Sequence, residues 1–216
     1  MRNTLTIISF LFLTNFLMAQ SGEWRVLSGV KISSKWGQKP PYSRFGEDVF
    51  IDVEEVKPIV LSTFSAIYSN KLTSTFQWSL GFNYNNKGFR EIGVGNLTGG
   101  GGSQYYNRKN TMHYLGILGG VRCNFIQKDR WHIGFETLLN PEIQVQNYLD
   151  FTKLNLSTIN MFYIEKKVNN HFSIVLNPFF ETSITEYNKT DPIFPSIQYN
   201  PYGYGLMAGV KYRIFK

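Results

Sequence analysis

The chain of 216 residues has few cysteines, few charged residues and no long apolar run after its N-terminal segment. It contains one cysteine, Cys123, which cannot form an internal disulfide and which we expect to be a small apolar filler in a strand, the alternative being a reactive thiol. Charged residues make up only 17% of the chain, which is low for a soluble domain. No helical stripe is visible, and after residue 19 no apolar run is long enough for a transmembrane helix. These shortages favour an all-β protein.

Sequence signals for cofactors, metals and nucleic acid are also missing. The formal net charge is +7, but the charges are scattered without a basic run, so we expect no nucleic-acid partner. His113 and His132 have no neighbours at metal-ligand spacing, and we expect lumen or interface roles for them. The run Gly99–Gly102 is not followed by the Lys-Ser/Thr of a phosphate loop. We therefore predict no cofactor.

Residues 1–19 have the pattern of a secretory signal peptide. Arg2 supplies the charge, Leu5–Leu17 form the apolar core, and Ala19 precedes a cut at Gln20. An uncleaved anchor is the alternative, but the run is short for a membrane span. No cysteine follows the cut, which disfavours a lipoprotein. The predicted organisation is a signal peptide over 1–19 and one domain over 20–216.

What the mature sequence contains is strict alternation. At the end of the chain, every second residue from Tyr204 to Ile214 is apolar, while Lys211 and Arg213 fall on the other face. Such a terminal strand behind an export signal is typical of an outer-membrane β-barrel. We predict an eight-stranded antiparallel up-and-down transmembrane β-barrel, with a soluble β-sandwich as the alternative. The predicted strands are Trp24–Ser34, Pro58–Tyr68, Thr75–Tyr84, Met112–Phe125, Trp131–Ile143, Lys153–Ile164, Phe172–Ile184 and Tyr204–Ile214.

The predicted connections alternate in length and orient the chain. Short turns at Ser69–Lys71, Gln127–Asp129 and Asn169–Asn170 contain Asn or Asp, which tolerate the positive φ of tight turns. Longer links, which we expect to be extracellular loops, cover Gly37–Val56, Asn85–Asn110 and Tyr187–Tyr202; the link at 147–150 is a short exception. We therefore expect both termini in the periplasm. An aromatic girdle is expected at the periplasmic strand ends, formed by Trp24, Tyr68, Phe76, Phe125, Trp131, Phe162, Phe172 and Tyr212.

Two prolines interrupt predicted strands of a barrel that has no edge. Proline removes a ladder hydrogen bond, so Pro141 and Pro178 need an explanation. We expect a bulge, or a strand that has risen above the lipid, at Pro141. Pro178 lies closer to the predicted membrane zone.

The alternation assigns charged side chains of both signs to the barrel interior. An eight-stranded barrel has a lumen that side chains fill, so we expect ion pairs to close it and do not expect a porin. The alternative is that many of these charges face water above the membrane. The predicted inward residues are Arg25, Lys31, Arg122, Glu136, Glu142, Glu181, Lys211 and Arg213.

One short pattern could support catalysis. His171-Phe172-Ser173 has the H-x-S spacing of lipid A deacylases, and alternate strand positions share a face. However, Ile174 replaces the Asn that follows Ser in that family, and the position is the periplasmic end. We predict no catalytic residues.

The stretch Phe82-Asn83-Tyr84-Asn85-Asn86-Lys87-Gly88 resembles the strand end of the PorT-like outer-membrane β-barrel family of bacteria with type IX secretion. The Ala19-Gln20 cleavage context and the closing Gly209-Val210-Lys211-Tyr212-Arg213 are also similar. The resemblance implies the barrel fold, the outer membrane and a link to secretion.

We therefore expect a non-enzymatic outer-membrane barrel with a structural or partner-binding role. As partners of this basic barrel we expect outer-membrane lipid and lipopolysaccharide. The alternatives are an accessory subunit of a secretion or uptake complex, bound to another outer-membrane protein, and a lipid-modifying enzyme. The loop residues Tyr105, Tyr106, Arg108 and Lys109 could bind glycan, lipopolysaccharide or a protein, or form a solvated mobile loop.

Overall fold

The computed structural model describes residues 22–37, 43–44, 49–97, 103–146, 154–185, 187–189 and 197–214. The predicted signal peptide, the Gly99–Gly102 run, the link at 147–150 and the last two residues lie outside this part. None of the described residues forms a helix long and apolar enough to cross a membrane.

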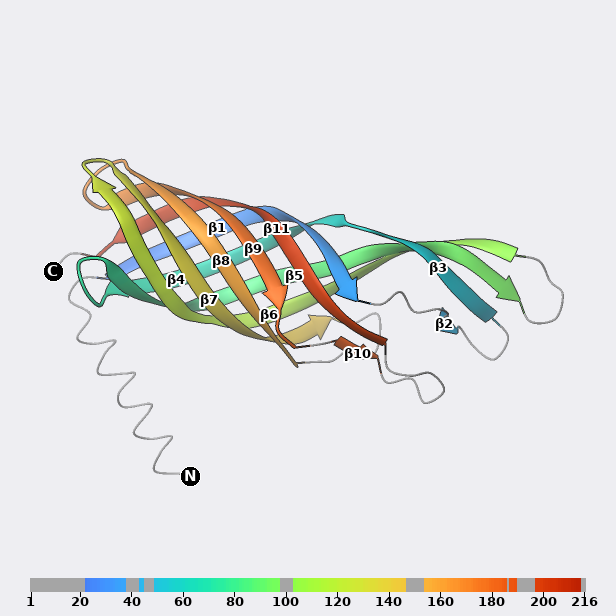
Figure 1. The fold of residues 1–216 in the computed structure, drawn as a ribbon. Coiled ribbons are helices and arrows are strands. Elements are labelled where there is room, and N and C mark those ends of the chain that lie inside the picture. Colours follow the sequence, from blue (N-terminus) through green and yellow to red (C-terminus); the bar gives the residue numbers. More distant parts are fainter. Residues whose placement is uncertain are drawn as a thin grey trace, which may run out of the picture.

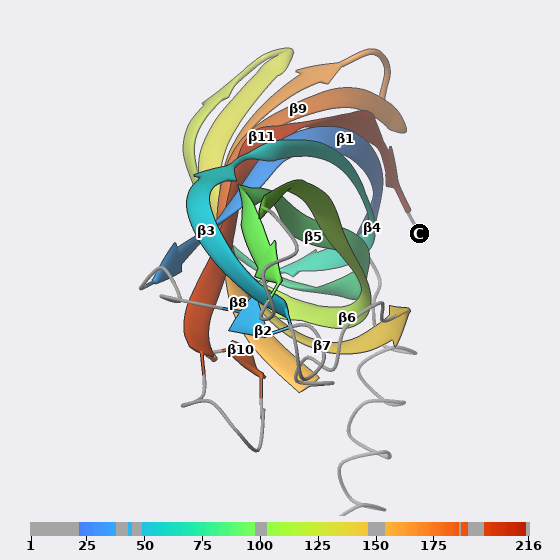
Figure 2. The same ribbon diagram turned by 90° about the vertical axis from the view of Figure 1, so that its right-hand side faces the viewer.

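Eight antiparallel strands close into a barrel (Figures 1 and 2). β1 pairs with β4 on one side and with β11 on the other, and this last pairing joins the first strand of the barrel to the last. Each remaining barrel strand pairs with its neighbours in sequence, as in an up-and-down barrel. The eight-stranded prediction is confirmed, and the sandwich alternative is wrong. The barrel strands are β1 (Gly22–Gly37), β4 (Ile59–Lys71), β5 (Phe76–Leu97), β6 (Ser103–Lys128), β7 (Trp131–Gln146), β8 (Leu154–Lys167), β9 (Phe172–Ser183) and β11 (Ile197–Arg213).

One end of the barrel, here called the turn end, carries three short connections. The β6–β7 turn contains Asp129 with φ of 30°, as a tight hairpin requires. β4 runs on through the predicted turn Ser69–Lys71, so the chain reverses at 72–75 instead. β8 likewise extends past Ile164 to Lys167. The chain enters and leaves the barrel at this end, where Ile214 N donates to Gly22 O at 2.9 Å.

The opposite end of the barrel, here called the extended end, contains strands where the sequence predicted loops. Asn85–Asn110 is not a loop: β5 and β6 continue as a paired hairpin to Asn96 and Ser103. β3 (Val49–Lys57) runs beside β5, and the short β2 (Ser43–Arg44) pairs with β3. This extension of β3, β5 and β6 projects beyond the other strands in Figure 1. β10 (Tyr187–Lys189) pairs with the start of β11, within the third predicted loop.

Neither proline shifts the register of its strands. β6 and β7 pair at Gly116–Glu142 and again at Gly119–Leu139 in the same register, with pairing interrupted only around Pro141. Pro178 likewise interrupts the pairing of β8 with β9 between Met161–Phe179 and Ile164–Leu176. No bulge lies at Pro141 itself, and the nearest register shift of β7 against β6 lies at Gln144–Gln146. The other expectation, a strand that has risen above the lipid at Pro141, stays a prediction. Each proline stays paired with a strand on its other side, so the barrel loses pairing locally without changing its register.

The outer surface of the barrel is apolar and ends in aromatic side chains. Along β9 exposed and buried residues alternate almost without exception, and every exposed residue of this strand is apolar. At the turn end, Tyr68, Trp24, Tyr212 and Phe172 lie opposite one another across four neighbouring strands. Trp24 and Tyr68 rings lie 5.3 Å apart, and those of Phe172 and Tyr212 lie 5.1 Å apart. This row has the form expected of an interfacial girdle.

Candidate functional site

The lumen is the candidate site because the charged side chains of the barrel converge there. Near the turn end, Arg25 donates two hydrogen bonds to Glu136, at 2.7 and 2.6 Å. Both side chains are fully buried. Glu136 also accepts a hydrogen bond from Ser79 Oγ at 2.5 Å, and Arg25 donates to Ser69 Oγ at 3.2 Å. This bidentate pair joins β1 to β7 across the lumen.

Arg122 lies beside this pair, and its guanidinium group makes fewer hydrogen bonds than that of Arg25. Its Nη1 donates to Gln77 Oε1 at 3.1 Å, and its guanidinium lies 4.5 Å from the Tyr163 ring centroid. The carboxylates of Glu136 and Glu23 are 3.7 Å away. Nε and Nη2 make no hydrogen bond within the described part of the chain. Arg122 is thus held by one hydrogen bond, by a cation–π contact with Tyr163 and by the attraction of two carboxylates.

A second group of ion pairs closes the mouth of the barrel at the turn end. Lys211 bridges Glu23, at 3.1 Å, and Glu165. Arg213 bridges the same two carboxylates, at 3.1 and 2.6 Å. His132 Nδ1 is 3.5 Å from Glu165, which places this histidine at the mouth of the lumen. Lys211 and Arg213 are two residues apart in β11 and therefore lie on the same face of the strand. Their ion pairs connect β11 to β1 and β8.

A third group fills the lumen towards the extended end. Lys31 contacts Glu181 at 2.5 Å, and Lys87 contacts both Glu181, at 2.9 Å, and Glu142. Asn85 donates to Glu181 at 2.5 Å, and Asn155 donates to Glu142. All of these side chains are buried. The positive charges therefore face carboxylates in a medium where leaving either unpaired would be costly.

An apolar layer separates the turn-end ion pairs from those of the third group. Leu27 lies between Arg25 and Lys31 in β1, and Leu138 lies between Glu136 and Glu142 in β7. The lumen is therefore not polar throughout, as predicted from the sequence, because an apolar layer lies between the polar groups of its two ends. Its buried residues are Leu27, Ile67, Leu118, Leu138, Ile159, Met161, Tyr163, Val175, Phe179 and Met207.

All eight predicted inward charges belong to these groups, and three partners were missed. Seven of the eight are buried and Arg213 is partly exposed at the mouth, so the alternative that they face water is wrong for them. Lys87 was missed because it was assigned to a loop. Glu23 and Glu165 lie one residue outside the predicted ends of their strands. If the predicted strands had been extended to include these residues, the alternation of faces would have assigned all three side chains to the lumen.

The residues of the possible catalytic pattern have different surroundings. Ser173 is buried on the lumen side of β9. The His171 ring stacks on Tyr212, an exposed residue of the girdle, with centroids 6.1 Å apart.

His113 lies on the outer face, where Nδ1 is 2.7 Å from the Tyr84 hydroxyl. Cys123 is half-buried in β6, in the strand position expected for it. No three metal-ligating side chains come together within the described ranges.

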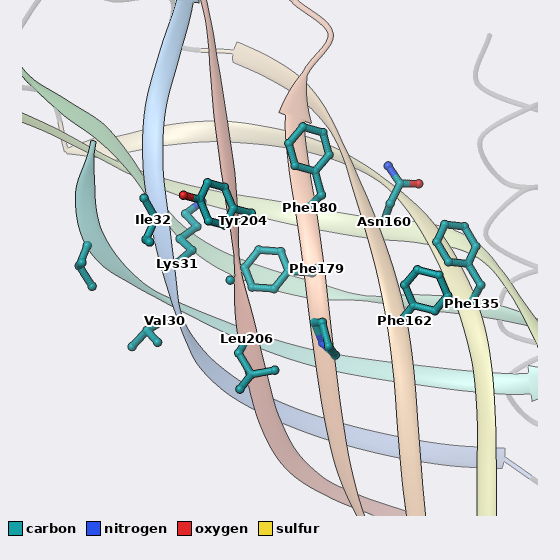
Figure 3. A pocket seen from close by; sticks show the side chains of 13 residues that line it. Val30, Lys31, Ile32, Phe135, Asn160, Phe162, Phe179, Phe180, Tyr204 and Leu206 are labelled. Atoms are coloured by element: carbon teal, nitrogen blue, oxygen red, sulfur yellow. The ribbon is translucent and has the colours of Figure 1, made fainter. Parts of the chain in front are cut away.

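A shallow depression of about 730 Å³ lies on the outer surface across β1, β11, β9, β8 and β7 (Figure 3). Its lining includes Pro178 and Gly205 together with larger side chains, among them Phe162, Phe180 and Tyr204. The lining is apolar apart from Asn160, which accepts a hydrogen bond from Thr137 at 3.0 Å, and part of Lys31. Its position on the apolar outer face fits a surface in contact with lipid.

The chain has no match among family models or among curated proteins. Among solved structures it is similar to the outer membrane protein OprG of Pseudomonas aeruginosa, with 8% identity and a TM-score of 0.50, over 91% of this chain and 98% of that chain. The fold is that of a small outer-membrane β-barrel.

Two other outer-membrane barrels are similar at lower scores. They are the Escherichia coli outer membrane protein W, with 11% identity over 88% and 97% of the two chains and a TM-score of 0.41, and Ail of Yersinia pestis, with 13% identity over 88% and 99% and a TM-score of 0.38. Identities this low concern the fold alone. The lumen of this outer-membrane barrel must therefore be interpreted from its own residues.

Proposed function

We propose that this protein is a closed, non-enzymatic barrel of the bacterial outer membrane that acts through its extension rather than through a pore. The observation that carries the proposal is the layered lumen. Ion pairs fill it on both sides of an apolar layer, and the buried carboxylates each bind a cation of the protein. An ion crossing this lumen would have to displace these pairs and enter a layer lined mainly by apolar side chains.

The proposed orientation places the turn end, with both chain ends, in the periplasm. Short turns gather at that end, and the long strands of the extension leave the barrel at the other. This is the usual asymmetry of outer-membrane barrels. The extension would then stand above the outer leaflet, where it can meet lipopolysaccharide or another protein.

Planar-bilayer recording tests the closed lumen. The purified full-length protein, with insertion verified by heat-modifiable gel mobility, should produce no discrete conductance steps. A porin inserted under the same conditions serves as the positive control. Reproducible single-channel steps from the wild-type protein would overturn the proposal.

The absence of catalysis is tested separately through His171 and Ser173. Cells that carry His171→Ala and Ser173→Ala should have the same lipid A as wild-type cells, because Ser173 is buried in the lumen and His171 stacks on the outer girdle. Mass spectra of extracted lipid A provide the measurement. An acyl-chain difference between the two strains would favour the enzyme alternative.

One observation favours the accessory-subunit alternative, and it agrees with the resemblance to PorT-like proteins. Residues 103–112 of β6 pair with β5, whereas pairing with β7 begins only at His113. Within the described residues, no strand covers the other edge of this segment, and such an edge can accept a partner strand. Purification from detergent-solubilised membranes should then yield a stoichiometric partner, which is lost when residues 89–110 are replaced by a short turn.

A further inference from the structure

Three cations lie side by side on the outer face of the extension. Lys57 of β3 is opposite Arg90 of β5, and Arg90 is opposite Lys109 of β6. All three side chains are exposed. Because neighbouring strands are about 4.8 Å apart, the three stems span roughly 10 Å in a line across the sheet. We call Lys57, Arg90 and Lys109 the cation row.

The cation row is not explained by pairing within the protein. Like charges directly opposite each other destabilise a sheet. Lys57 contacts Glu55 at 3.1 Å, in a pair that is half exposed on both sides. Arg90 and Lys109 make no ion pair within the described part of the chain, unlike the lumen cations. The arrangement therefore favours an external anion that would offset the repulsion.

The residues below the cation row indicate where it lies relative to the membrane. On the outer face of β5 and β6, the opposite pairs change along the strands from Phe82–Ile117 through Tyr84–Leu115 and Asn86–His113 to Arg90–Lys109. The Tyr84 hydroxyl lies 2.7 Å from His113 Nδ1, a polar contact typical of an interface.

The height of the cation row follows from strand geometry. At about 3.3 Å per residue and a tilt of about 40°, each residue rises roughly 2.5 Å, so an apolar band of about 25 Å that starts at Phe76 ends near Asn86. Arg90 is then roughly 10 Å above the band, and long Lys and Arg side chains can reach back towards the membrane surface. This is the headgroup region of the outer leaflet.

We propose that the cation row binds the phosphorylated headgroup of an outer-leaflet glycolipid. Guanidinium and ammonium groups on three strands can contact more than one phosphate at once, with Arg90 in the centre as a bidentate donor. The lipid chains would then lie along the apolar outer face of β5 and β6, which Phe82 and Ile117 expose. The inference rests on the proposed orientation and deepens it by naming the lipid-binding residues.

The test compares two variants of equal charge. One carries Lys57→Gln, Arg90→Gln and Lys109→Gln. The control carries Lys71→Gln, Lys128→Gln and Lys166→Gln, three exposed lysines at the turn end. Each full-length protein is reconstituted in phosphatidylcholine vesicles, and binding of fluorescent bis-phosphorylated lipid A is measured. Heat-modifiable mobility first establishes that each variant is inserted, so that failure of the barrel is distinguished from failure of the site.

The wild-type protein and the control variant should bind equally, and the cation-row variant at least about tenfold more weakly, as expected for three lost cations near an anionic surface. Lipid A without phosphates should bind the wild type as weakly as phosphorylated lipid A binds the cation-row variant. Equal binding by the cation-row variant and the wild type would overturn the site. Displacement of the lipid by millimolar inorganic phosphate would overturn the lipid as ligand and indicate a site for free phosphate.

Discussion

At the scale of single residues, the lumen charges differ in how completely they are satisfied. Glu136 accepts hydrogen bonds from Arg25 and Ser79 and lies 3.7 Å from Arg122. It therefore balances two buried guanidinium groups, one of which has two nitrogen atoms without an acceptor within the described residues. Removal of a single negative charge here would leave two positive charges in the same enclosed space.

Replacing Glu136 by Gln should therefore destabilise the barrel strongly. We expect the free energy of unfolding to fall by about 3–5 kcal/mol, the usual cost of breaking a buried pair from one side. Urea unfolding in phosphatidylcholine vesicles, followed by tryptophan fluorescence, measures this. Glu55→Gln, in the exposed pair with Lys57, is the control and should cost less than about 1 kcal/mol. Equal effects of the two substitutions would contradict the importance assigned to the lumen pair.

At the scale of elements, the extension depends on close contact between β5 and β6. A Cβ atom at Gly88 would lie 2.1 Å from the backbone oxygen of Asn110 and 3.0 Å from Ile59 Cδ1. Gly88 N also donates to Ser33 Oγ at 3.1 Å, where the extension leaves the barrel. By contrast, a Cβ atom at Gly119, within the barrel part of β6, would meet nothing within 4 Å.

Gly88→Val should separate the extension from the barrel without unfolding the barrel. We expect limited proteolysis to cut this variant between residues 89 and 110, while its heat-modifiable mobility stays that of the wild type. Gly119→Val is the matched control and should resist the protease as the wild type does. If Gly88→Val leaves the extension intact under the same digestion, close packing at Gly88 is not what holds it.

The same element shows the limit of reading strands from the sequence. Phe76 to Tyr84 alternates between apolar and polar residues, and that segment was predicted correctly. Beyond Tyr84 the strand has no lipid on one side, so the apolar half of the pattern disappears although the backbone pairing continues to Asn96. The alternation of apolar and polar residues marks the part of a strand that faces lipid, and it does not mark the whole strand. The strand predicted from it therefore ended at Tyr84.

At the scale of the whole molecule, buried ion pairs link strands that are not neighbours in the barrel. Arg25 with Glu136 joins β1 to β7, and Lys31 with Glu181 joins β1 to β9. All four side chains are at most 2% exposed. Buried pairs are screened by salt much less than exposed ones.

Stability of the inserted barrel should therefore depend little on salt. Between about 0.05 M and about 0.5 M NaCl, the free energy of unfolding in zwitterionic vesicles should change by less than about 1 kcal/mol. The same urea titration at both salt concentrations measures this. A fall of several kcal/mol in the free energy of unfolding at high salt would mean that water and ions reach the ion pairs and that the lumen is open.

The sequence by itself determined the number of barrel strands, the inward face of the eight charged residues predicted there, and the aromatic row of Tyr68, Trp24, Tyr212 and Phe172 at the turn end. These follow from a period of two along each strand, which is a local property. Only the tertiary structure decided which charges pair, that an apolar layer divides them, and that β3, β5 and β6 continue beyond the barrel. Those features depend on strand register and on barrel closure, which bring residues more than one hundred positions apart, such as Arg25 and Glu136, into contact.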